Sequence, residues 1–397
     1  MRRYLTCFFA IFLLLSVAVL FLNYRVDPFG AWRTHDKPLS VFSIGNVSYA
    51  RLAKAHWIAQ QQSDLVVLGN SHAVSAFQAD QLRRHLDAST PFNLALLGTS
   101  LSEMTRNMRH AYYASGARRF LVVVDLLNFR DHTTARGNEF TVALALDDSL
   151  GSRYFAARNF AATTYSWAAT TRSLLALRAG YLDSNTAEGF VKNCKNEIQG
   201  GPLSRLVSSA QARRDMFQST DYLGTGDSTA WREPLGELMA FIAQQQLDVT
   251  FLVPPFHLSY YYALDASGAW DKHQQMLQLL VESIVAAGVE QHTHLVDFTA
   301  FNRYTGEFHS DPRARLDYWL DADHFNCAMA ELIIARTAQL INPAGQIAPE
   351  SEARLGARVT AANLAEHQRR LNHELQAWKA ANPEAHAWLS RRIQPLP

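Results

Sequence analysis

Three residues of this 397-residue chain have the types and the order that nucleophilic catalysis requires. Ser71 follows the apolar run 65–68, and Asp321 and His324 stand near the other end of the chain, three residues apart. A serine nucleophile needs a base, and the base needs a carboxylate that orients it. Because one turn of a loop can present both members of a three-residue spacing, we expect His324 to be the base and Asp321 its partner.

The segment around Ser71 has the pattern of a strand, a tight turn and a helix. The strand is predicted at 64–68, the turn at 69–71 and the helix at 73–86. This pattern puts the hydroxyl at the carboxyl end of a parallel strand, where open α/β sheets bind ligands. It also puts the hydroxyl at a helix N-terminus, where free N–H groups can stabilise a developing anion. A helix-capping role for Asn70 or Ser71 is the alternative explanation of this segment.

Strands and helices are predicted to alternate through most of the chain. Four further apolar runs predict strands, and helical spacing of apolar residues lies between them. The alternation predicts an α/β fold, doubly wound and flavodoxin-like, around a mainly parallel five-stranded sheet. The predicted strands after the first are 92–96, 119–124, 247–253 and 294–298, and the main helices are 101–115, 234–246, 270–288 and 328–340.

Two regions depart from this alternation. Strand signals fade over about 131–231, which predicts a helical insertion after the third strand. Such an insertion either shapes the substrate cleft or packs as an appendage, and the sequence leaves both open. The last segment, 346–397, has helical spacing and forms a C-terminal tail. We therefore divide the chain into a membrane segment at 1–24, an α/β domain at 25–345 and this tail.

The N-terminus predicts a membrane anchor. Residues 4–24 carry no charge and are long enough to cross a bilayer as a helix. They exceed the usual apolar core of a signal peptide and lack a small-residue cleavage site, which favours an uncleaved anchor. The short tail with Arg2 and Arg3 favours a cytoplasmic N-terminus, with the body outside the cytoplasmic membrane. The alternative is a buried helix of a soluble fold.

Composition narrows the classes of function. Hydrophobic residues make up 48% of the chain and charged residues 18%, so a folded core is expected. The net charge is +1 without a long basic run, which argues against nucleic acid as a partner. Three scattered cysteines predict no zinc site, and we expect no metal and no cofactor. Cys194 and Cys327 either pair in an oxidising compartment or stay free.

The order of these motifs resembles the SGNH/GDSL-type hydrolase superfamily, over about residues 60–130 and 245–340. Ser71 matches the nucleophile of the first block, and Asp321 and His324 match the C-terminal D-x-x-H. Gly98 matches the second block, whereas the third block, at 124–129, lacks the usual glycine and offers Asn128. The resemblance implies an oxyanion hole made by the backbone N–H groups of Ser71 and Gly98 and by the Asn128 amide.

The implied chemistry is acyl transfer through a serine ester, ending in hydrolysis or in transfer to another hydroxyl. Anchored SGNH-like proteins are often associated with O-acetylation or deacetylation of polysaccharides. The resemblance therefore implies acyl esters, acetyl above all, of an envelope or exported polysaccharide. It also implies a membrane acyltransferase partner, with the body in the periplasm of a bacterial inner-membrane protein. His72 and His257 are candidate substrate contacts, although a solvated loop is the simpler expectation for His257.

Two other functions remain open at this point. The incomplete third block is compatible with an inactive SGNH-like scaffold that binds glycan or an assembly partner. Asp321, Asp323 and His324 also have the ligand types of a metal-dependent phosphoesterase.

Overall fold

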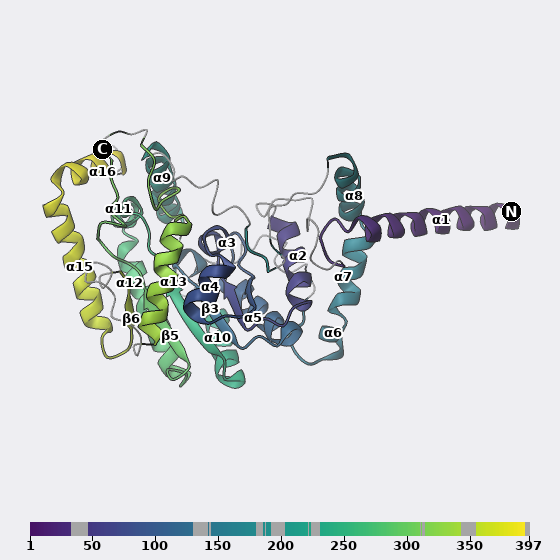
Figure 1. Ribbon diagram of the computed structural model, residues 1–397, viewed down its shortest axis with the longest axis horizontal. Helices are drawn as coiled ribbons and strands as arrows, with labels where there is room; N and C mark the ends of the chain where they lie inside the picture. Colours follow the sequence, from purple (N-terminus) through teal and green to yellow (C-terminus); the bar gives the residue numbers. More distant parts are fainter. Residues whose placement is uncertain are drawn as a thin grey trace.

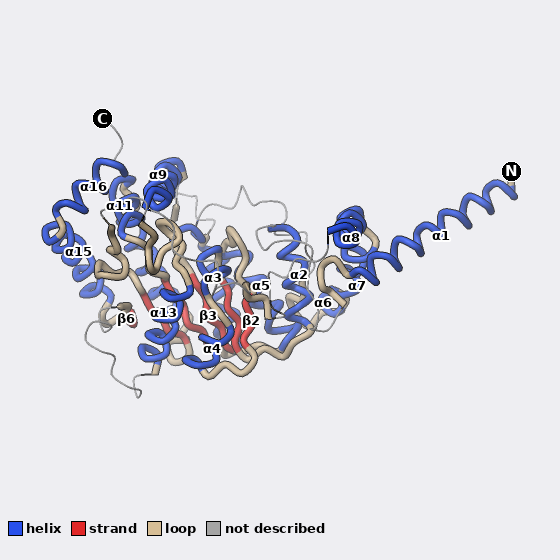
Figure 2. Tube along the Cα trace, turned by 45° about the horizontal axis from the view of Figure 1, so that its top comes forward, coloured by secondary structure: helices blue, strands red, loops and turns tan. Residues whose placement is uncertain are grey.

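A six-stranded mixed sheet forms the centre of the protein (Figure 2). The computed structural model describes residues 1–32, 47–129, 142, 144–179, 186, 188–191, 203–220, 222–223, 231–309, 311, 314–342 and 355–393. The strands lie in the order β2-β1-β3-β4-β5-β6. They are β1 (Leu65–Leu68), β2 (Pro91–Asn93), β3 (Arg119–Val123), β4 (Asp248–Val253), β5 (Thr293–Asp297) and β6 (Ala357–Val359).

The first five strands pair in parallel, as their apolar runs predict. The sixth strand was not predicted, and the expectation of five strands is therefore wrong. β6 comes from the C-terminal region and pairs antiparallel with β5, with Val359 opposite Leu295. It has only three residues, too few to show a strand period in the sequence.

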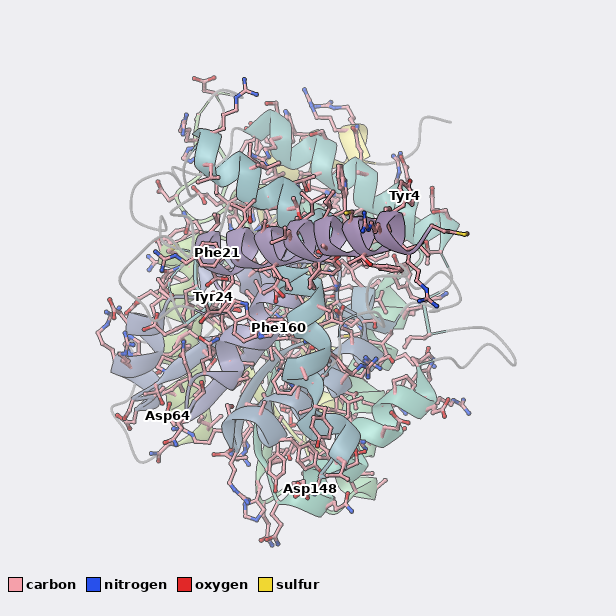
Figure 3. All side chains as sticks on the ribbon, turned by 90° about the vertical axis from the view of Figure 1, so that its right-hand side faces the viewer. Tyr4, Phe21, Tyr24, Asp64, Asp148 and Phe160 are labelled. Carbon is pink, nitrogen blue, oxygen red and sulfur yellow. The ribbon has the colours of Figure 1, made fainter. Side chains whose placement is uncertain are left out.

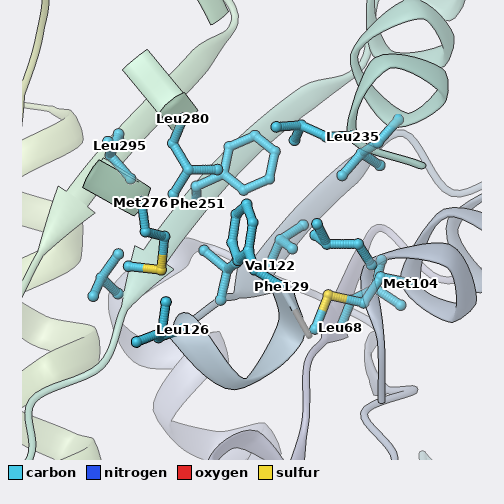
Figure 4. Packing of buried hydrophobic residues seen from close by; sticks show 14 of the residues in the cluster. Leu68, Met104, Val122, Leu126, Phe129, Leu235, Phe251, Met276, Leu280 and Leu295 are labelled. Carbon is cyan, nitrogen blue, oxygen red and sulfur yellow. The ribbon is translucent and has the colours of Figure 1, made fainter. Parts of the chain in front are cut away.

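Apolar side chains cover both faces of the sheet. In β1, Val66 and Leu68 belong to one buried cluster, and Leu65 and Val67 belong to the other. Alternate residues of a strand point to opposite faces, so the two clusters are the two layers between sheet and helices. Figure 4 shows the larger layer, where Leu68, Val122 and Phe251 meet side chains from the covering helices.

Helices far apart in the sequence share each layer. The larger layer includes side chains from α5 (Leu101–Ser115), α10 (Arg232–Gln245) and α12 (Trp270–Ala286). The smaller layer includes side chains from α3 (Ser71–Ala76), α4 (Ala79–Leu86) and α13 (Cys327–Ile341). α3 and α13 thereby come together on one face, which brings the two ends of the predicted catalytic set close in space.

The predicted helix 73–86 is two helices, α3 and α4. Phe77 between them has extended backbone angles, and its side chain is fully buried. Gln78 starts α4 with a capping box, in which its side chain and that of Gln81 each accept a hydrogen bond from the other residue's backbone. Burying Phe77 and capping the new helix favour the break over a continuous helix.

The part of the insertion that the structure describes is helical, as predicted. It contains α6 (Leu150–Arg153), α7 (Phe155–Thr164), α8 (Trp167–Ala179) and α9 (Leu203–Ser219). α7 and α8 pack against the N-terminal helix α1 (Arg2–Val26), whereas α9 packs against α11 (Leu258–Ser267) in the body. The insertion thus contacts both the N-terminal helix and the main domain (Figure 1).

α1 projects from the body and is the one described helix long and apolar enough to cross a membrane (Figure 1). The body begins directly at its end. Asp27 accepts hydrogen bonds from the N–H groups of Ala31 and Trp32. Phe29 is fully buried, and its carbonyl accepts a hydrogen bond from the Trp57 indole of α2 (Val47–Ala59). This junction ties α1 to the core of the domain.

The C-terminal tail is helical, as predicted, and consists of α15 (Leu364–Ala381) and α16 (Pro383–Ile393). It packs back on the domain, because Leu371 and Leu375 are buried and His367 Nε2 lies 2.7 Å from an Asp297 carboxylate oxygen.

Cys327 at the start of α13 is disulfide-bonded. Cys194, the residue for which pairing with Cys327 was left open, lies outside the described residues.

Candidate active site

Ser71, His324 and Asp321 form a connected triad. Ser71 Oγ lies 2.9 Å from His324 Nε2. The other ring nitrogen, His324 Nδ1, lies 2.9 and 3.0 Å from the two carboxylate oxygens of Asp321. The serine hydroxyl, the imidazole and the carboxylate are therefore in the arrangement by which a base activates a nucleophile. The structure brings together the three residues that sequence order had selected.

The turn before Ser71 depends on a glycine. Gly69 has φ +151°, and a Cβ placed there would lie 2.9 Å from Val123 Cβ and 3.0 Å from Val123 O. The turn therefore passes too close to β3 for any side chain. Asn70 then caps α3 by accepting a hydrogen bond from the N–H of His72. The cap is Asn70, which leaves the Ser71 hydroxyl to face His324.

The loop that carries the other two members is held at both ends. Asp321 Oδ1 accepts hydrogen bonds from the backbone N–H groups of Asp323 and His324, at 3.1 and 2.8 Å. The backbone of Trp319 pairs with that of Phe325 across the loop. Asn326 closes the loop by capping α13. The carboxylate that orients the imidazole also shapes the turn on which the imidazole stands.

The triad remains accessible from outside. The His324 side chain is 22% exposed and the Asp321 side chain 13%. Ser71 is partly buried. An ester could therefore reach the hydroxyl, while the imidazole is largely removed from water.

A second, buried set of charges lies directly behind the triad. His72 Nδ1 lies 2.7 Å from Asp125 Oδ2, and the Asn70 side-chain amide donates to the same oxygen at 2.7 Å. His72 Nε2 lies 3.3 Å from Asp323 Oδ2. Arg213 of α9 lies 2.5 Å from that Asp323 oxygen. Two carboxylates are thus matched by a histidine and a guanidinium.

The charge states in this set follow from the contacts. Burial by itself lowers the pKa of His72, but Asp125 and Asp323 outweigh it and raise that pKa to about 9. Burial likewise favours a neutral Asp323, but the neighbouring His324, His72 and Arg213 hold the pKa of Asp323 well below its usual range. At neutral pH, His72 is a cation and Asp323 an anion. The triad therefore stands beside a compensated ion network.

The other implied oxyanion donors lie on two adjacent loops. Gly98 has φ +66° in the loop after β2. The Asn128 side-chain amide donates to the carbonyl of Thr99 at 2.7 Å, and its oxygen accepts from the Asp125 N–H at 2.8 Å. Asn128 thus joins the loop after β3 to the Gly98 loop, and one of its two amide hydrogens is engaged in doing so.

The expectation of a solvated His257 is wrong. Its side chain is buried, accepts a hydrogen bond from the Ser259 N–H as the cap of α11, and places Nε2 2.8 Å from the Glu307 carbonyl. Burial lowers the pKa of His257 to about 4, so the ring is neutral. His72, the other candidate substrate contact, is also buried and belongs to the ion network. Both histidines hold protein groups in this structure.

The residue types suggested for a metal centre do come together in part. His72, Asp323 and His324 each offer a ligand atom within 4.8 Å of the others. Two properties oppose a cation there. Asp323 is already in contact with Arg213 and accepts a hydrogen bond from Ser209, and His72 is protonated at neutral pH. The donor set is arranged for internal charge pairing and does not fit a divalent metal.

Three residues of the ion network are not among those predicted from the sequence. Asp125 follows an apolar strand, and a charge directly after such a run is a usable signal. Arg213 and Ser209 lie within the insertion, more than a hundred residues from their partner Asp323, and no local spacing points to them.

Comparison with known proteins adds no assignment. A scan against protein-family models gives no match, and a search of curated proteins gives no significant match. The case for a function therefore depends on the geometry of the site.

Proposed function

We propose that this chain is a membrane-anchored serine enzyme that transfers an acyl group through an ester on Ser71. The observation that carries the proposal is the 2.9 Å contact between Ser71 Oγ and His324 Nε2, with Asp321 on the opposite ring nitrogen. The same residues follow the motif order of an SGNH-like, doubly wound hydrolase, which supports the same chemistry. The products are a free acid if water accepts the acyl group, or a new ester if a hydroxyl accepts it.

The catalytic cycle uses the triad twice. His324 takes the Ser71 proton as the hydroxyl attacks the ester carbonyl, and Asp321 stabilises the resulting imidazolium. His324 then gives that proton to the leaving alcohol, and the acyl group stays on Ser71. An incoming water or hydroxyl then attacks the acyl-enzyme as it loses its proton to His324, and His324 returns this proton to Ser71 Oγ as the bond between Ser71 and the acyl group breaks. Protons and bonds balance over the two halves.

The negative charge that develops on the carbonyl oxygen of the ester must be stabilised by hydrogen-bond donors. The backbone N–H groups of Ser71 and Gly98 are the proposed donors, together with the Asn128 amide. Removing one donor of this kind typically lowers the rate on the order of a hundredfold or more. In this proposal, Asn128 contributes its second amide hydrogen while the first holds the Thr99 carbonyl.

The N-terminal helix is proposed to stay on the protein as the anchor. The Asn23 side chain is buried, and its amide donates to the Thr164 carbonyl at 2.8 Å and to Thr170 Oγ1 at 3.0 Å. Phe29, just beyond, belongs to the domain core. Cleavage near the end of α1 would remove these contacts, which supports a retained helix over a signal peptide. The basic Arg2 and Arg3 support a cytoplasmic N-terminus and a periplasmic body.

For the substrate, we propose acetyl esters of an envelope or exported polysaccharide, with a membrane acyltransferase as partner where the acyl group is passed on. The support is the resemblance in motif order together with the anchor. An open, partly exposed triad suits a bulky glycan better than an enclosed cavity would.

The test uses the full-length chain in detergent and 4-nitrophenyl acetate. We expect acetate release from the wild type, and loss of release and of fluorophosphonate labelling in Ser71→Ala. Ser208→Ala, which changes an exposed serine on α9, is the matched control and should behave as the wild type. Near-ultraviolet circular dichroism checks that each variant is folded. A wild type that neither releases acetate nor labels would overturn the enzyme and favour the scaffold alternative.

A further inference from the structure

Exposed apolar side chains gather in one part of the insertion. Beyond the end of α1 at Val26, nine large apolar side chains are exposed in the described part of the chain, and eight of them lie between Leu150 and Leu177. Trp167 is 83% exposed, Leu177 66% and Leu174 55%. Surface patches of this kind mark an interaction with another protein or with a membrane. The remaining members are Leu150, Tyr154, Phe160, Tyr165 and Leu175, and the ninth side chain, Val285, lies on α12.

This patch lies next to α1. Residues 2–15 of α1 are exposed, whereas a stripe farther along is partly or fully buried against α7 and α8. The partly or fully buried residues of this stripe are Ser16, Val19, Leu20, Leu22, Asn23 and Val26. Ser16 Oγ lies 2.8 Å from the Tyr165 hydroxyl, at the turn between α7 and α8. Figure 3 shows the labelled Phe160 of α7 just below α1 in that view, where the two helices are in contact.

The position of this contact along α1 can be compared with the thickness of a bilayer. At 1.5 Å per residue, the part of α1 from Arg2 to Ser16 is about 21 Å long. A hydrocarbon core is about 30 Å thick. If Arg2 marks the inner boundary, the exposed part of α1 is too short to span the core by about 9 Å. The missing length corresponds to the segment of α1 that α7 and α8 cover.

We propose that α7 and α8 form a membrane-docking hairpin, seated in the outer interface of the bilayer that α1 crosses. This inference rests on the proposed anchor. The Tyr165 side chain, whose hydroxyl meets Ser16, reaches into the acyl boundary, and the exposed side chains of both helices contact lipid. Asn23, about 31 Å from Arg2 along the helix axis, lies at the outer edge of the core, where its buried hydrogen bonds to α7 and α8 form.

The charge of the segment fits an anionic lipid surface. Residues 149–182 contain no Asp or Glu and four arginines. Arg172 stacks on the Tyr49 ring of the body, with its guanidinium carbon 4.6 Å from the ring centre. Arg158 of α7 and Arg178 of α8 are exposed, on the helices that carry the apolar side chains. Tyr165 and Trp167 are the residue types that gather at the level of lipid headgroups. Helices that expose basic, aromatic and aliphatic side chains together are typical of membrane interfaces.

Lipid is the occupant that these observations favour over a protein partner. The helices that carry the exposed apolar side chains pack directly against α1, and the exposed surface of α1 must contact lipid if it spans the membrane. A partner that covered only α7 and α8 would leave the short exposed part of α1 unexplained.

The test places spin labels on the full-length chain in nanodiscs of phosphatidylethanolamine and phosphatidylglycerol, with no other protein present. All variants carry Cys7→Ser, which removes the exposed free cysteine. Labelling of Cys7→Ser alone gives the residual signal to be subtracted. Cysteines are then introduced singly as Leu174→Cys and Leu177→Cys. Leu13→Cys on α1 is the lipid reference, and Val285→Cys is the matched exposed apolar site on α12. Electron paramagnetic resonance measures the accessibility of each label to oxygen, which enters lipid, and to a water-soluble nickel chelate.

The oxygen-to-nickel ratio at positions 174 and 177 is expected to be several-fold higher than at 285 and closer to that at 13. If the ratio at 174 and 177 is like that at 285 while position 13 is in lipid, the membrane docking of α7 and α8 is wrong and the anchor stands. The exposed apolar side chains would then be assigned to contact with a protein partner. Water accessibility at position 13 as well overturns the anchor and the hairpin together. Quenching of Trp167 by brominated lipids, taken as the difference between the wild type and Trp167→Phe, is an independent measure that needs no introduced cysteine.

Discussion

The rings of His72 and His324 lie 5.2 Å apart between centres, and the Asp323 carboxylate lies near both. Asp323 Oδ2 is 3.3 Å from His72 Nε2, and its Oδ1 is 3.6 Å from His324 Nδ1. The proposed catalytic base therefore has a second carboxylate close to the nitrogen that Asp321 orients. This relationship links the triad to the buried ion network, and substitutions in one set or the other separate their contributions.

Asp321→Asn tests the orienting carboxylate. An amide keeps the size of the side chain but no longer favours the imidazole tautomer that accepts the serine proton. We expect acyl-transfer activity to fall by about 10³ to 10⁴, as seen when the same change is made in other serine triads. The measurement is kcat for 4-nitrophenyl acetate, and Asp317→Asn, at an exposed site on the same loop, is the control. A loss of less than tenfold would mean that Asp323 can replace Asp321.

His72 makes stability depend on pH in a defined direction. Its pKa is raised from 6.5 to about 9 in the folded protein. The stabilisation by the folded ion network is therefore fully present below about pH 6.5 and is lost as the pH rises through 9. The free energy of unfolding of the wild type minus that of His72→Gln should fall over this window by on the order of 3 kcal/mol. Urea unfolding at several pH values measures it, and a difference independent of pH would show that His72 is neutral.

Arg213→Gln tests the guanidinium that the insertion supplies to Asp323. Removing one partner of a largely buried ion pair leaves the other charge under-compensated, at a cost of about 2 to 4 kcal/mol when some solvent can enter. The Arg213 side chain is 24% exposed, so the lower part of that range is expected. Arg205→Gln, at an exposed site of the same helix, should change stability by less than about 0.5 kcal/mol. Equal effects of the two changes would show that the pair does not stabilise the fold.

Gly69→Ala tests the turn that positions the nucleophile. The new methyl group would meet Val123 at about 3 Å from both its Cβ and its carbonyl oxygen. We expect a loss of about 1 to 3 kcal/mol in the free energy of unfolding and a further loss of activity, because Ser71 must shift with the turn. Gly236→Ala in α10 is the control: apart from its chain neighbours and the backbone of its own helix, no atom lies within 4 Å of the added Cβ, and the change should stabilise the helix by about 0.5 to 1 kcal/mol. Full activity in Gly69→Ala would show that the turn can move without displacing Ser71.

The sequence was most informative where local pattern and chemistry agree. Ser71 follows a strand that is buried on both faces, and Asp321 and His324 share one short loop, so their residue types and spacing pointed to the same site. The parallel strands were predictable for a similar reason, because continuous apolar runs are typical of strands covered on both sides.

The failures have physical causes as well. Residues 258–264 of α11 are all buried, so this helix has no polar face to reveal its period, and His257 was placed in a loop instead of at its cap. Arg213 reaches Asp323 only because α9 packs on α11, a tertiary contact without a local signature. The sequence predicts that α7 and α8 are helical but not that their apolar side chains are exposed, because apolar residues at helical spacing indicate a buried face as readily as a lipid-facing one.

The junction after α1 determines where the proposed enzyme can work. Residues 27–31 are buried, and Phe29 is held by the Trp57 indole, so this junction is not a free tether. A catalytic serine carried in this way stays at a nearly constant height above the bilayer. A small soluble ester would reach it from any direction, whereas a long polymer would be modified only where its chain passes at that height. The spacing of acyl groups along such a polymer would then depend on how fast the polymer moves past the site.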